Sequence, residues 1–149
     1  MPRFESRDPH FEERVRESFA RQTLMETIGA RLSLVSPGEV EIDLPYRKDL
    51  SQQHGYLHAG VVTAIVDTAC GYSALTLMEA GADVLTVEYK INFVSPARGE
   101  RLVARGRVTR PGRTVTVCAG DVYAVSEGEE KLVASMLATM ISLKGEPAA

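Results

Sequence analysis

The hydrophobic pattern of the chain changes at residue 59, where a long apolar run begins. Between Ala59 and Met78 almost every position is apolar or small, and Asp67 is the one carboxylate or basic group. The run has the length of a membrane span, but a charge near its middle would cost about 2.5–3.5 kcal/mol on insertion. A helix that is apolar nearly all round lies instead inside a folded protein. The sequence therefore predicts a buried central helix, around which the rest of the chain wraps.

Two elements with different periods precede this helix. From about residue 10 to residue 29, apolar side chains recur every four or five positions, which predicts one amphipathic helix that covers the core. An alternative is that this helix is a lid lining an apolar tunnel. The segments Arg31–Val35 and Val40–Pro45 then alternate apolar and polar residues on either side of a turn. Such alternation predicts a β-hairpin with one wet face.

Four strand-like segments follow the central helix, separated by turns rich in glycine, proline and charged residues. They are Val84–Phe93, Arg101–Thr109, Thr114–Ala124 and Lys131–Ser142. The order helix, two strands, buried helix, four strands predicts an α+β fold in which one antiparallel sheet curls around the central helix. We expect residues 1–149 to form a single domain, with the N-terminal helix at about 10–29 and the core at about 31–142.

Composition and charge narrow the range of partners. The net charge is −3 and no block of lysine and arginine occurs, which argues against nucleic acid as a partner. The N-terminus lacks the apolar segment of a signal peptide, so we expect a cytoplasmic protein with no membrane association. Cys70 and Cys118 are expected to be small buried residues. The three histidines lack metal-ligand spacing, so no metal site is expected.

Residues at the start of the central helix suggest a site for a carbonyl oxygen. The amides of Ala59 and Gly60 would have no helical acceptor and would carry partial positive charge, which suits an oxyanion. His58 is better placed to order the loop through a hydrogen bond than to act as a base. Asp67 is the candidate acid, although on its own it could equally be a buried carboxylate satisfied by hydrogen bonds.

The spacing of these groups predicts a site shared between two chains. Asp67 follows Ala59 by eight residues, which is about 12 Å along a helix, so one helix cannot bring both to one carbonyl. If two subunits pair with their central helices antiparallel, Ala59 of one chain faces Asp67 of the other, and two equivalent sites result.

Motifs and element order together resemble the hotdog-fold acyl-CoA thioesterases of the phenylacetate-degradation (PaaI-like) type, in the 4HBT superfamily. The resemblance runs from about Arg31 to Ser142. It rests on Gln52, Gly55, His58-Ala59-Gly60, Asp67, Gly71, Thr86-Val87-Glu88, Ile91, Phe93, Ser95-Pro96-Ala97, Gly99 and Gly112-Arg113. The chain departs from the family at two positions, with Gln52 in place of an asparagine and Ala59 in place of a glycine. The longer amide can still reach a carbonyl, and alanine keeps its backbone N–H.

The resemblance implies hydrolysis of a fatty (medium- or long-chain) or aryl acyl-CoA to the free acid and coenzyme A. Asp67 would act as general base or nucleophile, Gln52 and His58-Ala59-Gly60 would hold the thioester carbonyl, and Thr86 would hold the attacking water. No cofactor is required, because coenzyme A is part of the substrate. The resemblance also implies sheets joined edge to edge in an obligate homodimer, and we expect these dimers to pair into a tetramer.

Three turn residues are candidates for holding the phosphates of coenzyme A. They are Gly112, Arg113 and Arg98, because guanidinium groups beside strand ends suit phosphates. Arg113 is the preferred contact, although each arginine could also be a solvated turn residue.

The acyl group and the reaction retain alternatives. Phe19, Met25 and Tyr72 could border an apolar tunnel, which favours a fatty chain over an aryl acid. A non-catalytic acyl-CoA binding protein on the same fold is one alternative function. Another is a hotdog hydratase or dehydratase with His58 as its histidine, although the approach loop 52–57 lacks the prolines of the acyl-carrier dehydratases.

Overall fold

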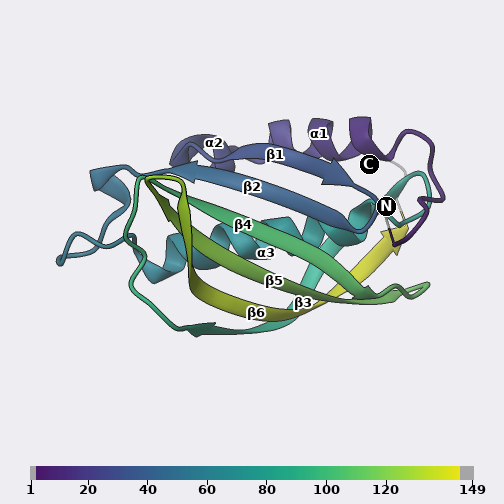
Figure 1. The fold of residues 1–149 in the computed structure, drawn as a ribbon. Coiled ribbons are helices and arrows are strands. Elements are labelled where there is room, and N and C mark those ends of the chain that lie inside the picture. Colours follow the sequence, from purple (N-terminus) through teal and green to yellow (C-terminus); the bar gives the residue numbers. More distant parts are fainter. Residues whose placement is uncertain (1–2, 145–149) are drawn as a thin grey trace.

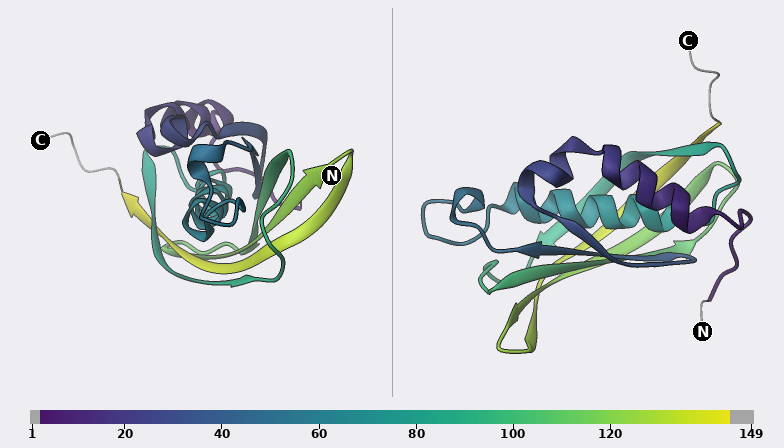
Figure 2. Two further views of the ribbon diagram at one scale, coloured as in Figure 1. Left: turned by 90° about the vertical axis from the view of Figure 1, so that its left-hand side faces the viewer. Right: turned by 90° about the horizontal axis from the view of Figure 1, so that it is seen from above.

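A six-stranded antiparallel sheet wraps around one long helix in the computed structural model, which describes residues 3–144 (Figure 1). The strands are β1 (Arg31–Ser36), β2 (Glu39–Pro45), β3 (Ala82–Phe93), β4 (Arg101–Arg110), β5 (Val115–Ser126) and β6 (Glu129–Lys144). Their order in the sheet is β1-β2-β4-β5-β6-β3. Helix α3 (Ala59–Leu75) lies in the concave face of the sheet (Figure 2). The predicted α+β hotdog architecture is confirmed; residues 1–2 and 145–149 of the expected domain lie outside the described part.

Two glycines of the sheet allow α3 to approach closely. A Cβ atom at Gly106 in β4 would lie 2.4 Å from the backbone of Ala69, and one at Gly120 in β5 would lie 2.6 Å from Val66. Gly71, a small residue of α3 itself, takes no part in this close approach. Gly71 instead lines a cavity, and a Cβ there would meet only the sulfur of Met140 at 4.0 Å. The close approach therefore depends on the strands.

The N-terminal segment forms two helices, so the prediction of one helix over residues 10–29 is wrong. Helix α1 (Phe11–Arg21) is followed by α2 (Thr23–Ile28), and Gln22 between them has an extended backbone with φ −82° and ψ 94°. The break lets the Gln22 side chain reach α3, where it is bonded to both Tyr72 and Thr68. A hydrophobic pattern with intervals of four or five residues does not reveal a one-residue interruption.

Helix α1 is anchored to the C-terminal end of α3 by Arg14. Its guanidinium group donates hydrogen bonds to the backbone oxygens of Leu75, Met78 and Glu79, at 2.8, 2.9 and 2.5 Å respectively. Carbonyl groups after a helix end lack helical donors and carry partial negative charge, so a cation stabilises them. The helix ends at Leu75, three residues before the apolar run itself ends.

Strand β3 forms an exposed edge of the sheet. It is 12 residues long, while the strand at the opposite edge, β1, has six. Large apolar side chains of β3 are open to solvent: Leu85 (56%), Val87 (56%), Tyr89 (46%) and Phe93 (46%). A long edge strand with exposed apolar side chains readily pairs with a strand of another chain.

Candidate active site

The loop before α3 leaves one backbone donor free at the helix start. His58 is the N-cap residue, and its Nδ1 accepts a hydrogen bond from the backbone N–H of Gly60 at 2.7 Å. No acceptor among the described residues takes the N–H of Ala59. The sequence named both amides as oxyanion donors, but here the imidazole already occupies that of Gly60. The Ala59 amide is therefore the donor available to a ligand.

Gln52 takes part in ordering the same loop. Its side-chain carbonyl oxygen accepts a hydrogen bond from the backbone N–H of His54 at 2.5 Å, and its backbone N–H donates to the oxygen of Tyr56. Its side-chain NH2 group remains to meet a carbonyl oxygen. A mostly apolar cavity of about 580 Å³ adjoins this loop, which we call the helix-start cavity. Its lining is Gln52, Gln53, Tyr56, Leu57, His58, Ala59, Val62, Phe93, Val94, Ser95, Pro96, Ala97 and Val133.

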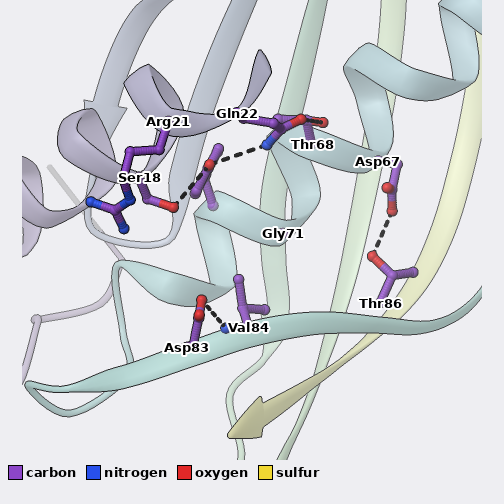
Figure 3. A pocket seen from close by; sticks show the side chains of 10 residues that line it. Ser18, Arg21, Gln22, Asp67, Thr68, Gly71, Asp83, Val84 and Thr86 are labelled. Atoms are coloured by element: carbon purple, nitrogen blue, oxygen red, sulfur yellow. Dashed lines mark hydrogen bonds between the residues drawn. The ribbon is translucent and has the colours of Figure 1, made fainter. Parts of the chain in front are cut away.

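Asp67 lies further along α3, at a different cavity of about 350 Å³, which we call the Asp67 cavity (Figure 3). The hydroxyl of Thr86 in β3 donates a hydrogen bond to Asp67 Oδ1 at 2.8 Å. Burial raises the pKa of Asp67 above its ordinary value, because the charged form loses hydration, and the hydrogen bond from Thr86 partly opposes this rise. The side chain is thus a half-buried carboxylate of increased basicity.

Much of the Asp67 cavity is lined by residues that the sequence analysis did not select. Ser18, Arg21 and Gln22 come from the α1–α2 region, and Thr68 belongs to α3 (Figure 3). Tyr72 of α3, which the sequence did select, lines the same cavity. A glutamine and a serine on the apolar side of an amphipathic helix were the available signal. Of the three residues expected to border an apolar tunnel, Tyr72 lines this cavity with its hydroxyl hydrogen-bonded, whereas Met25 is fully buried in the core.

Within one chain, the acid and the free amide face different spaces. The helix-start cavity and the Asp67 cavity share no lining residue. Their separation agrees with the eight-residue interval between Ala59 and Asp67, which corresponds to about 12 Å of helix. One chain therefore does not present both groups to one carbonyl.

The three candidate phosphate contacts also lie apart within one chain. Gly112 and Arg113 line a cavity of about 490 Å³ together with Arg7 and Lys144. Arg98 lies in the connection from β3 to β4, near the opposite end of β4. A ten-residue strand at about 3.3 Å per residue separates these ends by about 30 Å. The three residues of one chain therefore cannot contact the same phosphate.

Metal sites, membrane-spanning helices and cysteines were also considered within residues 3–144. In this range no group of three or more His, Cys, Asp and Glu side chains is arranged to hold a metal ion. No helix in the same range has both the length and the apolar character needed to cross a membrane. Cys70 and Cys118 are free thiols, both buried.

Comparison with known proteins identifies the family. Residues 54–131, more than half of the chain, match the family model described as Thioesterase superfamily. Human acyl-coenzyme A thioesterase 13 is 30% identical over 112 residues, covering 73% of this chain and 78% of that protein. The match to a Saccharolobus solfataricus protein is 35% identical but shorter, with 54% of this chain and 56% of that protein covered.

Solved structures agree with this result. A thioesterase family protein from Silicibacter pomeroyi superposes with a TM-score of 0.89 at 52% identity, covering 91% of this chain and 99% of that one. The Escherichia coli PaaI protein of the phenylacetic acid degradation operon superposes with a TM-score of 0.82, covering 94% and 98% of the two chains. Its 17% identity establishes a shared fold alone. With the family match and the close structural relative, the chain belongs to the thioesterase superfamily and is a hotdog-fold thioester hydrolase.

Proposed function

We propose that this protein hydrolyses acyl-CoA thioesters at sites shared between two copies of the chain. The observation that carries the proposal is the separation, on one helix, of a basic carboxylate at Asp67 from a free amide at Ala59. Each cavity holds half of what thioester hydrolysis requires. A donor for the carbonyl oxygen lies in one, and a base for the attacking water lies in the other.

The edge strand β3 suggests how two copies join. Antiparallel pairing of β3 with the same strand of a second copy would cover its exposed apolar side chains and satisfy its free backbone groups. The two-fold axis of that pairing sets the two α3 helices antiparallel. The Asp67 cavity of one copy then meets the helix-start cavity of the other, which makes two equivalent sites.

In each shared site, the Ala59 N–H of one copy donates to the thioester oxygen, and the side-chain NH2 of Gln52 is the second donor. Asp67 of the other copy removes a proton from a water molecule, whose oxygen attacks the carbonyl carbon. The resulting oxyanion collapses, the carbon–sulfur bond breaks, and the sulfur receives the proton that Asp67 took from water. The products are a carboxylic acid and the free thiol of coenzyme A.

The role of Thr86 in this scheme is to orient the base. Its hydroxyl occupies Oδ1 of Asp67, so Oδ2 is the oxygen left to face water. Direct attack of Asp67 on the thioester, through a mixed anhydride, is the competing route. Turnover in ¹⁸O-labelled water, followed by mass spectrometry of the peptide containing Asp67, tests the choice. The proposed route leaves this peptide unlabelled, and label in the Asp67 side chain contradicts it.

The same pairing gives the phosphate candidates a common location. Antiparallel β3 strands place the end of β3 in one copy beside the start of β3 in the other, so Arg98 of one chain approaches the Gly112-Arg113 turn of its partner. We propose that these residues bind the phosphates of coenzyme A from two sides. Guanidinium groups on opposite sides of a diphosphate would both form charge-assisted hydrogen bonds.

A second interface would produce the dimer of dimers. On the sheet face turned away from α3, Val115, Val117 and Leu137 are 48%, 38% and 61% exposed. Packing this face against the same face of another dimer would bury them, and we propose this contact for a tetramer. Molecular mass in solution, measured by light scattering, tests it.

The release of free thiol from a panel of acyl-CoA thioesters tests the proposed activity. Asp67→Asn keeps the shape of the side chain and should lower the turnover number by about 100-fold or more. Asp49→Asn, at an exposed carboxylate paired with Arg47, is the matched control and should retain full activity. A non-catalytic binder would bind acyl-CoA without releasing thiol, and a hydratase would consume the double bond of an enoyl-CoA instead. Either result contradicts the proposal.

A further inference from the structure

The Asp67 cavity contains a polar network that thioester cleavage does not use. Gln22 Nε2 donates to the hydroxyl of Tyr72 at 3.1 Å, and the hydroxyl of Thr68 donates to Gln22 Oε1 at 3.2 Å. The Ser18 hydroxyl lies 3.1 Å from the same Tyr72 oxygen. Figure 3 shows Ser18 and Gln22 on the α1–α2 side of the cavity, away from the pair of Asp67 and Thr86. The cavity thus has a reactive end and a polar end.

The charges around the cavity decide which part of the substrate it can hold. Asp67 and Asp83 both line it, and Arg21 is the single cation in its lining. A diphosphate or a nucleotide phosphate would meet two carboxylates there and would be repelled. Because the thioester carbonyl must lie beside Asp67, the acyl group is the part of the substrate that enters this cavity.

The polar end provides hydrogen-bonding groups beyond those already satisfied. Gln22 donates one N–H to Tyr72 and retains a second, and its carbonyl oxygen and the hydroxyl of Ser18 each have a further lone pair. A methyl group placed there would leave these groups without partners, which carries a free-energy penalty. A neutral hydroxyl group, which both donates and accepts, satisfies them. A carboxylate would instead add a third negative group to a cavity with one cation.

From this arrangement, and resting on the proposed acyl-CoA hydrolysis, we propose that Gln22 and Tyr72 select acyl groups that carry a hydroxyl at their far end. Asp67 and Tyr72 are five residues apart on α3, about 7.5 Å along its axis, which an acyl chain of roughly five or six carbons can span. The substrates would be ω-hydroxyacyl thioesters of about this reach. The cavity volume of about 350 Å³ suits such a compact group.

The network also holds α1 and α2 against α3, so the test must separate selection from anchoring. Loss of anchoring would lower the melting temperature and slow every substrate alike. Loss of selection would change the ratio of kcat/KM between a hydroxyacyl thioester and its unsubstituted counterpart. The ratio is therefore the decisive measurement.

The experiment compares ω-hydroxyacyl-CoA with acyl-CoA of the same carbon number, using the intact protein and thiol release. The intact protein should prefer the hydroxyacyl member, and Tyr72→Phe or Gln22→Leu should each reduce that preference by about 3- to 10-fold, chiefly through a higher KM for the hydroxyacyl member. Thr27→Val is the control, because this exposed α2 hydroxyl bonds only the Thr23 carbonyl and lies outside the cavity.

Each outcome has one reading. If the intact protein has the same kcat/KM for the hydroxyacyl thioester and its unsubstituted counterpart, the inference is overturned and no variant is needed. The proposed hydrolysis is unaffected by that result. A stronger preference for an ω-carboxyacyl thioester also overturns it, and would assign the recognition to Arg21. Failure to hydrolyse either member of any pair refutes the proposed function itself. A preference that is retained in folded Tyr72→Phe and Gln22→Leu proteins removes these residues from substrate selection.

Discussion

The hydroxyl of Thr86 donates a 2.8 Å hydrogen bond to the carboxylate of Asp67, joining the edge strand β3 to the middle of helix α3. This bond lowers the pKa of a carboxyl group that burial raises. The two effects oppose each other at one oxygen. The pH below which activity falls is therefore set partly by Thr86, which does not itself react.

Thr86→Val should move this fall in activity to higher pH. Without the hydrogen bond, the charged form of Asp67 loses a stabilising donor and its pKa rises further. Because the proposed base must be ionised, kcat/KM should begin to fall at a higher pH than in the unchanged protein. Thr86→Ser keeps a hydroxyl and should leave the profile in place. Measuring kcat/KM from pH 4 to 9 tests this prediction. If the fall at low pH occurs at the same pH in Thr86→Val, ionisation of Asp67 does not cause that fall.

Asp67→Asn should also change how stability depends on pH. Since the pKa of Asp67 is raised in the folded state, its favourable contribution is present below the unfolded pKa and is lost as pH rises through the folded pKa. The ionised carboxylate thus costs stability at neutral pH, and asparagine does not ionise. The variant should melt at a higher temperature than the unchanged protein at pH 7. The difference should vanish near pH 4, about the ordinary pKa of aspartate. A lower melting temperature for the variant at pH 7 would show that the charge is fully compensated.

Ala59→Pro should remove the oxyanion donor while the helix remains. Proline is favoured at the first helical position, and His58 already has the extended backbone required before a proline, with φ −61° and ψ 138°. The lost donor should reduce kcat by about 10²- to 10³-fold, as for a missing oxyanion-hole amide. Ala59→Gly keeps the N–H and should retain most of the activity. Full activity in a folded Ala59→Pro protein would place the donor elsewhere.

Gly106→Ala should destabilise the fold by about 1–3 kcal/mol or more, because its Cβ would lie 2.4 Å from the backbone of Ala69. Gly71→Ala is a comparable change inside α3, where the nearest atom to the new Cβ beyond the local helix backbone is the Met140 sulfur at 4.0 Å. It should be neutral or stabilising, by about 0.5–1 kcal/mol. Urea unfolding of both variants tests the pair. Equal stability of the two would show that β4 and α3 can move apart at little cost.

The sequence was sufficient to predict the helices and strands that a local hydrophobic pattern marks, and the one charged residue that stands alone in an apolar run. The apolar run from residue 59 identified the buried helix, and Asp67 was selected because it is the one charge within that run. Alternating or strand-like segments bounded by turns identified all six strands, with ends that differ by a few residues from those of the structure. Each of these features depends on residues that are close together in the sequence, so it can be predicted without knowledge of the fold.

Features that depend on contacts between distant segments could not be predicted. Arg14 appears as a surface residue of an amphipathic helix, yet it lies on carbonyl groups more than sixty residues away. Gln22 lies on the apolar side of the predicted helix, but the local pattern does not show that it ends α1 or reaches Tyr72 and Thr68. Each of these contacts is set by tertiary packing rather than by local pattern.

The central claim, that each site draws on two chains, is tested most directly by mixing two inactive proteins. Asp67→Asn and Ala59→Pro subunits are combined in equal amounts under conditions that exchange protomers, and exchange is verified by mass. In a mixed dimer, one site receives both substitutions and the other receives neither. With random exchange, about half of the dimers are mixed, so activity should recover to about a quarter of the unmutated level per subunit. A site contained within one chain would carry one substitution or the other in every case, and activity would not recover. The absence of recovery in verified mixed dimers would therefore contradict the shared site.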